Sequence, residues 1–266
     1  MRTSGQGDQI LVFDAGTQSI RAALIDLRGE IRNMVKTPIT PYFSRQPGWA
    51  EQELDYYWQS FAATCRRLFD TEGVASDRIA GVAVTSQRAT MVNLDINGTP
   101  LRPAILWLDQ RKAEMKGHLS PLFTGVLKTV NQYGIVDKAI RECKSNWLIQ
   151  NQPDIWEKTH KFLFLSGFWI HRLTGEYRDS VGSQVGYIPF DYKRHCWAGP
   201  RDLKWKFFPM DPTLLPELVP PGGLLGHITR QACQETGIPE GLPVIAAATD
   251  KACEVLGAGC RSPEVA

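Results

Sequence analysis

Four residues near the amino terminus have the types and spacing needed to bind a phosphate group. They belong to the segment DAGTQS at positions 14–19, which lies between apolar runs at 10–13 and 20–25. Gly16 lets a ligand approach the backbone, and the hydroxyl groups of the segment can donate hydrogen bonds to phosphate oxygens. The carboxylate that opens the segment can bind Mg²⁺, directly or through water. The candidates are Asp14, Gly16, Thr17 and Ser19.

The pattern around this segment predicts a β-hairpin. Two apolar runs of strand length that flank a turn containing glycine are typical of antiparallel strands. A hairpin without a ligand accounts for the same residues, because Asp and Thr often satisfy backbone groups in turns. Both interpretations are open at this point.

Three later apolar runs, at 79–85, 104–108 and 244–248, also end at polar residues. Such runs are typical of buried strands. If the strands at 79–85 and 104–108 are neighbours, their ends converge on one rim of the sheet, where side chains can contact a ligand. The residues in these positions are Gln87 and Arg88, Trp107 and Asp109, and Asp250.

The composition is that of an ordinary globular protein, with 266 residues, 43% of them hydrophobic and 22% charged. A net charge of +2 is too small to favour nucleic acid or an anionic membrane as a partner. The six cysteines are scattered without a C-x-x-C pattern, which indicates reduced thiols. The amino terminus lacks the apolar core of a signal peptide, and no apolar run reaches membrane-spanning length. We therefore expect a soluble, cytoplasmic protein.

The order of the predicted elements indicates an α/β protein with a mixed sheet. Strands at 10–13, 20–25 and 31–39 form an antiparallel meander, followed by a helix at 53–69 and a strand at 79–85. A meander at the start, and the lack of a G-x-G-x-x-G motif, argue against a dinucleotide-binding domain. The elements expected beyond residue 90 are strands at 91–95 and 104–108, a largely helical region at 120–173 divided near Pro153, an irregular connection at 200–223, a strand at 224–228, a helix at 229–236 and a strand at 244–248.

Taken together, these motifs resemble those of the FGGY family of carbohydrate kinases. FDAGTQSIRAALID looks like the family's phosphate hairpin, D-x-G-T-x-S-x-R. TSQR at 85–88 and ILWLDQR at 105–111 fall where family members place sugar-contacting loops. PVIAAATDKACEVLGAG at 243–259 is similar to the segment with the catalytic aspartate. Four motifs in the expected order are far more specific than any one of them.

The resemblance implies an actin-like (ribonuclease H-like) ATPase domain with a mixed five-stranded sheet, an antiparallel amino-terminal meander and flanking helices. Family members have two such domains, of which the first binds most of the sugar and the second most of the ATP. Residues 1–248 would be the sugar-binding domain, and residues 249–266 the start of the ATP-binding domain. The G-G-x-x-x-S motifs of that second domain are not in the sequence, so we expect the chain alone to be inactive.

The resemblance also implies roles for the candidate residues. Asp250 would be the general base that accepts the proton of the sugar hydroxyl. Asp14 would hold Mg²⁺, while Thr17 and Ser19 would contact the transferred phosphate. The residues expected to contact the sugar are Gln87, Arg88, Trp107 and Asp109. Segments that contain Lys144, Ser183 and Gln184 reach the cleft in some relatives.

Several of these roles have a simpler alternative. Asp250 could be the N-cap of a helix. Asp109 could form a structural ion pair with Arg111, and Trp107 could belong to the core. Arg21, which could add positive charge beside the phosphate, could equally pair with a surface carboxylate.

Position 89 bears on the choice of substrate. Glycerol kinases have a glutamate after the Q-R pair, whereas Ala89 here removes that carboxylate and argues against glycerol. Xylulose kinases usually have Q-M-H, so Arg88 is atypical of them too. The expected substrates are pentuloses, hexuloses, polyols or aldonates, with ATP and Mg²⁺ as cofactors and a homodimer as a possible assembly. A non-catalytic sugar-binding remnant and an actin-like phosphatase or ATPase are the alternative functions.

Overall fold

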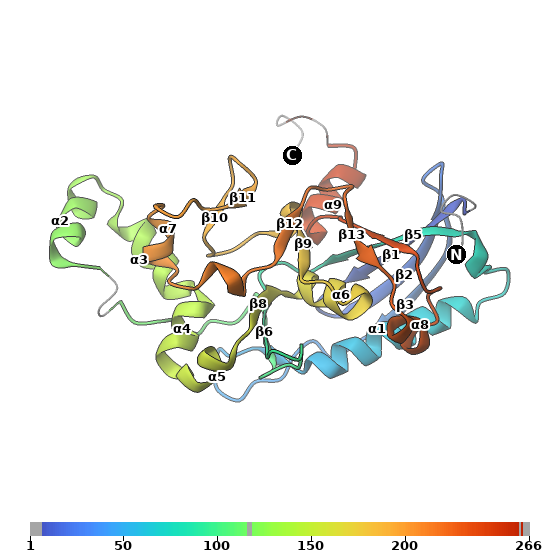
Figure 1. The fold of residues 1–266 in the computed structure, drawn as a ribbon, viewed down its shortest axis with the longest axis horizontal. Coiled ribbons are helices and arrows are strands. Elements are labelled where there is room, and N and C mark those ends of the chain that lie inside the picture. The colour runs from blue at the N-terminus through green and yellow to red at the C-terminus, as the bar shows by residue number, and fades with distance from the viewer. Residues whose placement is uncertain (1–6, 116–118, 261, 263–266) are drawn as a thin grey trace.

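The computed structural model describes residues 7–115, 119–260 and 262, which are organised around a six-stranded mixed sheet (Figure 1). Its strands are β1 (Gln9–Ala15), β2 (Ser19–Asp26), β3 (Ile31–Pro38), β5 (Ile79–Ser86), β13 (Leu224–His227) and β14 (Pro243–Ile245). They lie in the order β13–β14–β5–β1–β2–β3. The mixed sheet confirms the predicted fold class. It has one strand more than the five expected, because β13 pairs with the outer edge of β14.

The first three strands form the predicted antiparallel meander. Every second side chain of β1 is fully buried, which is the alternation expected of a strand in a sheet. On the other side, β5 runs parallel to β1, and β14 runs parallel to β5. Because β1, β5 and β14 share one direction, their carboxyl ends meet at the same edge of the sheet.

Helices α1 (Leu54–Phe69), α6 (Leu165–Thr174) and α8 (Arg230–Thr236) contact one another beside this sheet. The first was predicted from apolar residues that recur with helical spacing, the last was predicted at 229–236, and α6 lies in the region at 120–173 that was expected to be largely helical. Phe61 of α1 stacks on Phe13 of β1 and on Trp169 of α6, with ring centroids 4.0 and 5.1 Å apart. These fully buried rings lock the helices to the central strands.

A second, four-stranded sheet consists of β4 (Glu51–Gln52), β7 (Ala104–Ile105), β6 (Met91–Leu94) and β8 (Lys161–Phe164), in that order across the sheet. β8 corrects the expectation of a largely helical stretch at 120–173, because it pairs along its whole length with β6. A run of four residues has no periodicity that separates strand from helix. β5 and β7 belong to different sheets, so the strands at 79–85 and 104–108 are not neighbours.

The remaining helices lie mostly at the end of the molecule away from the main sheet (Figure 1). They are α2 (Pro121–Thr129), α3 (Tyr133–Glu142), α4 (Lys144–Asn151), α5 (Pro153–Lys158) and α7 (Lys204–Phe207), with α9 (Asp250–Gly257) following β14. Pro153 divides α4 from α5, as predicted. The short elements are β9 (Arg178–Ser180), β10 (Phe190–Asp191), β11 (Cys196–Trp197), β12 (Glu217–Val219) and the 3₁₀ turns η1 (Ser76–Arg78), η2 (Val181–Ser183) and η3 (Pro212–Leu214).

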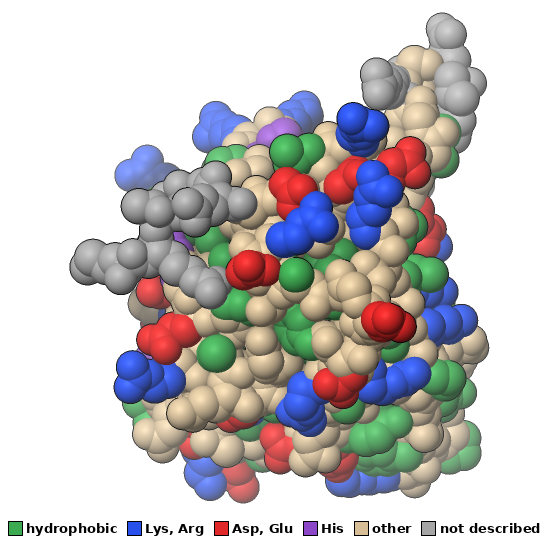
Figure 2. All heavy atoms as spheres, turned by 90° about the vertical axis from the view of Figure 1, so that its right-hand side faces the viewer, with side chains coloured by type: hydrophobic (Ala, Val, Ile, Leu, Met, Phe, Trp, Pro, Cys, Tyr) green, Lys and Arg blue, Asp and Glu red, His purple; other side chains and the backbone are tan. Residues whose placement is uncertain are grey.

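The surface in Figure 2 carries basic and acidic side chains that are interspersed, in keeping with the net charge of +2. Within the described part of the chain, no helix combines the length and the apolar character needed to cross a bilayer.

Candidate active site

The predicted site residues gather where the parallel strands of the main sheet end. Asp14 of β1 is in register with Thr85 of β5, and Ile245 of β14 is in register with Ala83. Gln87 and Arg88 therefore follow β5 at the edge where the β1–β2 turn lies. Asp250 follows β14 at the same edge, where side chains that come after parallel strands can converge on a ligand.

The β1–β2 turn is closed by a hydrogen bond from the Gly16 amide to the Ser19 carbonyl, at 3.1 Å. Asp14 and Arg21 face each other across the hairpin and form an ion pair. Their side chains are 31% and 44% exposed, so water and ligands reach both. The partner of Arg21 is therefore Asp14 itself, a carboxylate of the predicted phosphate site.

A chain of side-chain hydrogen bonds connects this turn to the residues expected to contact sugar. The Trp107 indole donates to Thr17 Oγ1 at 3.0 Å, and Thr17 donates to Gln87 Oε1 at 2.9 Å. The Gln87 amide group in turn donates to the hydroxyl of Tyr57 at 2.9 Å. Burial raises the pKa of Tyr57 to about 12, so this phenol stays protonated. Three sequence motifs thus meet at Thr17, although two of them are far away along the chain.

Trp107 borders a cavity of about 540 Å³. Its side chain is 53% exposed, which excludes the alternative of a core tryptophan. Ala89 lines the same cavity and adopts a φ of 55°, a left-handed conformation that is costly for a residue with a Cβ. Arg88, just before it, is exposed. Glu254 raises the pKa of Lys251 in α9, and the positive charge of Arg88 acts in the opposite direction.

Asp109 stands in the wall of this cavity with its carboxylate fully engaged. Both oxygens accept hydrogen bonds from Arg111 at 2.8 Å, and one also accepts from the Ala50 amide at 2.8 Å. Burial acts to raise the pKa of Asp109, but the hydrogen bonds from Arg111 and Ala50 outweigh it and the pKa is lowered. The structural ion pair considered for Asp109 and Arg111 is therefore present.

The wall continues as a buried network of charges. Glu51 pairs with Arg102 and, at 3.0 Å, with Arg111. The Arg111 guanidinium lies over the rings of Trp49 and Trp147, 4.0 and 4.7 Å from their centroids. This arrangement fixes the Arg111 guanidinium in the cavity wall, where its Nη1 atom has no hydrogen-bond partner among the described residues.

Lys144 joins the same network from α4. Its ammonium group donates to the backbone carbonyls of Asp109 and Arg111, at 2.9 and 3.0 Å. Burial lowers its pKa, against the opposing charge of Asp109. Lys144 thus lines the cavity, whereas Ser183 and Gln184 are buried outside its lining.

Asp250 is the first residue of α9 and is partly exposed. The residue in the N-cap position is Thr249, so Asp250 is not the N-cap that the sequence allowed as an alternative. One oxygen of the Asp250 carboxylate accepts a hydrogen bond from the Lys251 amide at 2.7 Å. Because the residue is partly exposed, its carboxylate is open to solvent at the strand-end edge.

Comparison with known proteins decides the family. The model of the N-terminal domain of the FGGY family of carbohydrate kinases matches residues 9–257. The chain belongs to this family. The chain is 29% identical to the uncharacterized sugar kinase YgcE of Escherichia coli over 97% of its own length and 45% of that protein. It is also 29% identical to L-fuculokinase of E. coli, over 96% of its length and 53% of that enzyme.

Solved structures agree with the fold of this FGGY chain. Xylulose kinase from Rhodospirillum rubrum superposes with a TM-score of 0.78 at 25% identity, over 96% of the chain and 51% of that enzyme. Gluconate kinase from Lactobacillus acidophilus gives a TM-score of 0.75 at 18% identity, over 94% of the chain and 50% of that enzyme. The FGGY chain spans about half the length of the curated relatives it matches.

Some residues of the FGGY site carry no clear signal in the sequence. Glu51 lies in the two-residue strand β4, and its partner Arg111 is 60 positions away. Glu142 and Tyr187 line the cavity beside Ala89, and a hydrogen bond to Glu142 helps to raise the pKa of Tyr187, after burial. Only pairing across the fold identifies these residues. By contrast, the apolar run before Gln87 was a usable signal.

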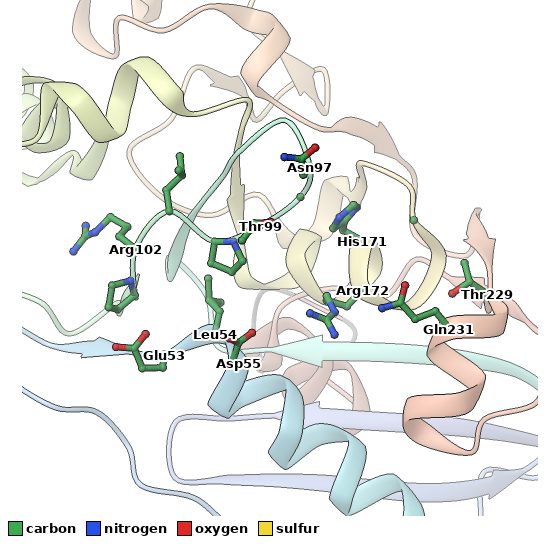
Figure 3. Close-up of a pocket in the computed structure, with 15 residues that line it drawn as sticks. Glu53, Leu54, Asp55, Asn97, Thr99, Arg102, His171, Arg172, Thr229 and Gln231 are labelled. Carbon is green, nitrogen blue, oxygen red and sulfur yellow. The ribbon is translucent and has the colours of Figure 1, made fainter.

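A larger cavity of about 730 Å³ lies elsewhere in the FGGY domain (Figure 3). It is formed by the start of α1, the loop at 97–103, α6 and the start of α8. None of the predicted site residues lines it. Size alone would therefore have pointed away from the residues that the motifs bring together.

Proposed function

We propose that the protein transfers the terminal phosphate of ATP to a hydroxyl group of a sugar, and that this chain is its sugar-binding half. The observation that carries the proposal is the convergence of Asp14, Gln87 and Asp250 on one sheet edge, next to the cavity bordered by Trp107. Residues 1–248 would form the sugar-binding domain and residues 249–266 would begin an ATP-binding domain. The matches to sugar kinases about twice as long support this division.

In the proposed mechanism Asp250 is the general base. A partly exposed carboxylate at a helix start can accept the proton of a sugar hydroxyl as that oxygen attacks phosphorus. The sugar would lie on the exposed face of Trp107, with Gln87 and Arg88 donating to its oxygens. Asp109 would act through the loop that it holds, since its oxygens are already bonded to Arg111.

The phosphate would be bound at the β1–β2 turn, by Thr17, Ser19 and the backbone at Gly16. Asp14 suits Mg²⁺, because this ion keeps several waters and needs few protein carboxylates when a nucleotide supplies phosphate oxygens. In the described residues no cluster of three or more His, Cys, Asp or Glu side chains is arranged to hold a metal without a nucleotide. When bound, Mg²⁺ would neutralise charge on the phosphates.

For the substrate we propose a pentulose, hexulose or aldonate in preference to glycerol. Ala89 provides no carboxylate to the cavity, whereas the exposed Arg88, its neighbour in the chain, offers several donors and no acceptor. A longer sugar has more oxygens to engage such a group than a three-carbon triol does.

The test is an ATP-coupled assay of the full-length protein and of the 266-residue chain, with pentuloses, hexuloses, polyols and aldonates. We expect sugar-dependent turnover by the full-length protein and none by the chain alone, because the second domain should supply most contacts to ATP. Titration calorimetry of the chain with the best substrate should still detect sugar binding. Sugar binding without turnover by the full-length protein would instead identify a non-catalytic sugar-binding protein.

A further inference from the structure

Asp179, at the middle of β9, is a buried carboxylate that the proposed mechanism does not use. It is 1% exposed, and its oxygens accept hydrogen bonds from neutral groups. Ser166 Oγ donates at 2.7 Å and Gln184 Nε2 at 2.9 Å to one oxygen, while the Ser180 amide donates at 2.8 Å to the other. Burial raises the pKa of Asp179 to about 6 in spite of these bonds.

The turn that follows Asp179 contacts the chain just before Asp250. The Ser180 hydroxyl donates to the Ala247 carbonyl at 2.5 Å, and the Thr249 amide donates to the Gly182 carbonyl at 3.2 Å. A Cβ on Gly182 would lie 2.9 Å from the Cβ of Ala248, so only glycine permits this approach. The turn at 180–182 therefore holds residues 247–249 from the side opposite to β5.

Asp179 fixes the shape of this turn. Gln184 Nε2 is shared between Asp179 and the Ser180 carbonyl, 3.0 Å away, which ties the two ends of the turn together. An asparagine of the same size would direct an NH₂ group at one of the donors that Asp179 now accepts from. The negative charge is costly to bury, and what it contributes is acceptance of hydrogen bonds from three directions at once.

We propose that Asp179 is a positioning residue for Asp250, acting through the 180–182 turn and residues 247–249. The inference rests on the proposed function of Asp250 as the general base. If the Asp250 carboxylate is displaced by a fraction of the reacting distance, the rate of phosphate transfer falls. Sugar binding, which uses Trp107 and Gln87, is not affected.

The test compares Asp179→Asn with Thr236→Val in the full-length protein. Thr236 is also fully buried and donates to the Ala232 carbonyl at 2.6 Å, but it lies on α8, away from α9 (Figure 1). For Asp179→Asn we expect kcat per sugar-binding site to fall roughly 10- to 100-fold, with the sugar Kd within about twofold of wild type. The number of sites is taken from the calorimetric stoichiometry, so that loss of folded protein does not count as loss of rate. The control should leave both quantities unchanged.

Amide hydrogen exchange provides a second measurement that needs no activity. Asp179→Asn should speed exchange in residues 247–253 while leaving β1 and α1 as in wild type, and Thr236→Val should not. Ser180→Ala, a milder change in the same turn, should do the same and serves if Asp179→Asn does not fold. If the wild type has no kinase activity, the proposed function fails. Hydrogen exchange then still tests whether Asp179 holds residues 247–249 through the 180–182 turn.

A double-mutant cycle of Asp179→Asn and Ser180→Ala then tests whether Asp179 acts through Ser180. Because Asp179 works through the turn that contains Ser180, the loss of kcat in the double variant should be clearly smaller than the product of the two single losses. Unchanged exchange at 247–253, or kcat losses that simply multiply, would overturn the proposal.

Discussion

Asp14 at the sheet edge and Asp109 in the cavity wall border the same site but are held in opposite ways. Asp14 is 31% exposed and has one ion pair, with an arginine that is 44% exposed. The Asp109 side chain is fully buried and bonded to Arg111, to the Ala50 amide and, at 3.3 Å, to Lys144. An exposed pair is weak and a ligand can replace one of its members, whereas a buried network resists any change. The comparison separates groups available for chemistry from groups that hold the cavity in shape.

The largest expected effect is on the stability of the buried wall. Asp109→Asn leaves Arg111 and Lys144 without their shared carboxylate, and we expect the free energy of unfolding to fall by roughly 3–5 kcal/mol. Arg21→Ala, which breaks the exposed pair, should cost no more than about 1 kcal/mol. Urea unfolding of both variants measures the difference. Equal losses would mean that burial does not distinguish the two regions.

Asp179 sharpens the comparison, because it is buried and none of the described residues pairs a cation with it. Its contacts are Ser166, Ser180, Ser183 and Gln184, while Arg178 and Glu217 on the paired strands β9 and β12 bind each other at 3.0 Å. The folded-state pKa of about 6 lies above the ordinary value of 3.8. Between these values the native state holds a proton that the unfolded chain has lost. This stabilisation is complete below the lower pKa and is lost as the pH rises through the upper one.

From about pH 4 to pH 7 the free energy of unfolding of the wild type should therefore fall by up to about 3 kcal/mol. The Asp179→Asn variant should not show this fall. Denaturant titrations of both proteins at several pH values measure this. Parallel stability curves would show that Asp179 titrates as it does in the unfolded chain.

At the open edge, the expected effect is on rate. Asp250→Asn in the full-length protein should lower kcat roughly a hundredfold or more, the usual scale for loss of a general base. Sugar affinity should stay within a few-fold of wild type, because Asp250 is not needed for stacking on Trp107. Steady-state kinetics together with calorimetry decide this. A variant with near-normal kcat would remove Asp250 from the mechanism.

The smallest effect concerns the choice of sugar. Arg88→Ala should weaken binding of the preferred sugar by about 1–3 kcal/mol, the cost of a lost charge-assisted hydrogen bond. Calorimetry with glycerol, xylulose and gluconate compares the variant with wild type. Arg78→Ala is the matched control, since its ion pair with Asp8 lies far from the cavity. Tightest binding of glycerol, or an unchanged affinity in Arg88→Ala, would contradict the proposed specificity.

Local patterns were enough to predict the meander, α1 and the strand before Gln87. In each of them the period of the apolar residues is set by the element's own geometry. The same reasoning missed β8, whose four residues show no period, and extended β7 to 108 although its pairing ends at Ile105. Contacts between distant residues left no trace in the pattern. Thr17 meets Trp107 from 90 positions away.

In the candidate site too, local motifs could be predicted and contacts between distant residues could not. Motif resemblance brought forward Asp14, Thr17, Gln87 and Asp250, which lie near the ends of β1, β5 and β14 and therefore gather at one edge of the main sheet. It also brought forward Trp107, which follows a strand of the second sheet and joins this edge by its hydrogen bond to Thr17. It did not reveal that Asp109 is sealed in a network, because its partners Ala50 and Lys144 come from other parts of the chain. Asp179 was not singled out either, since a lone Asp in a short strand has no periodic neighbour that marks it.

The pairing of β5 between β1 and β14 has a consequence for how the protein is made. β1 lies near the beginning of the chain and β14 near the end of the described part. During synthesis β5 can pair with β1 early, but its other edge stays open until β14 emerges. An unpaired edge of a buried strand is a place where other chains can add, and pairings between distant segments form slowly. We therefore expect this protein to be most prone to aggregation in the interval before β14 arrives, and chains that stop before Pro243 should aggregate.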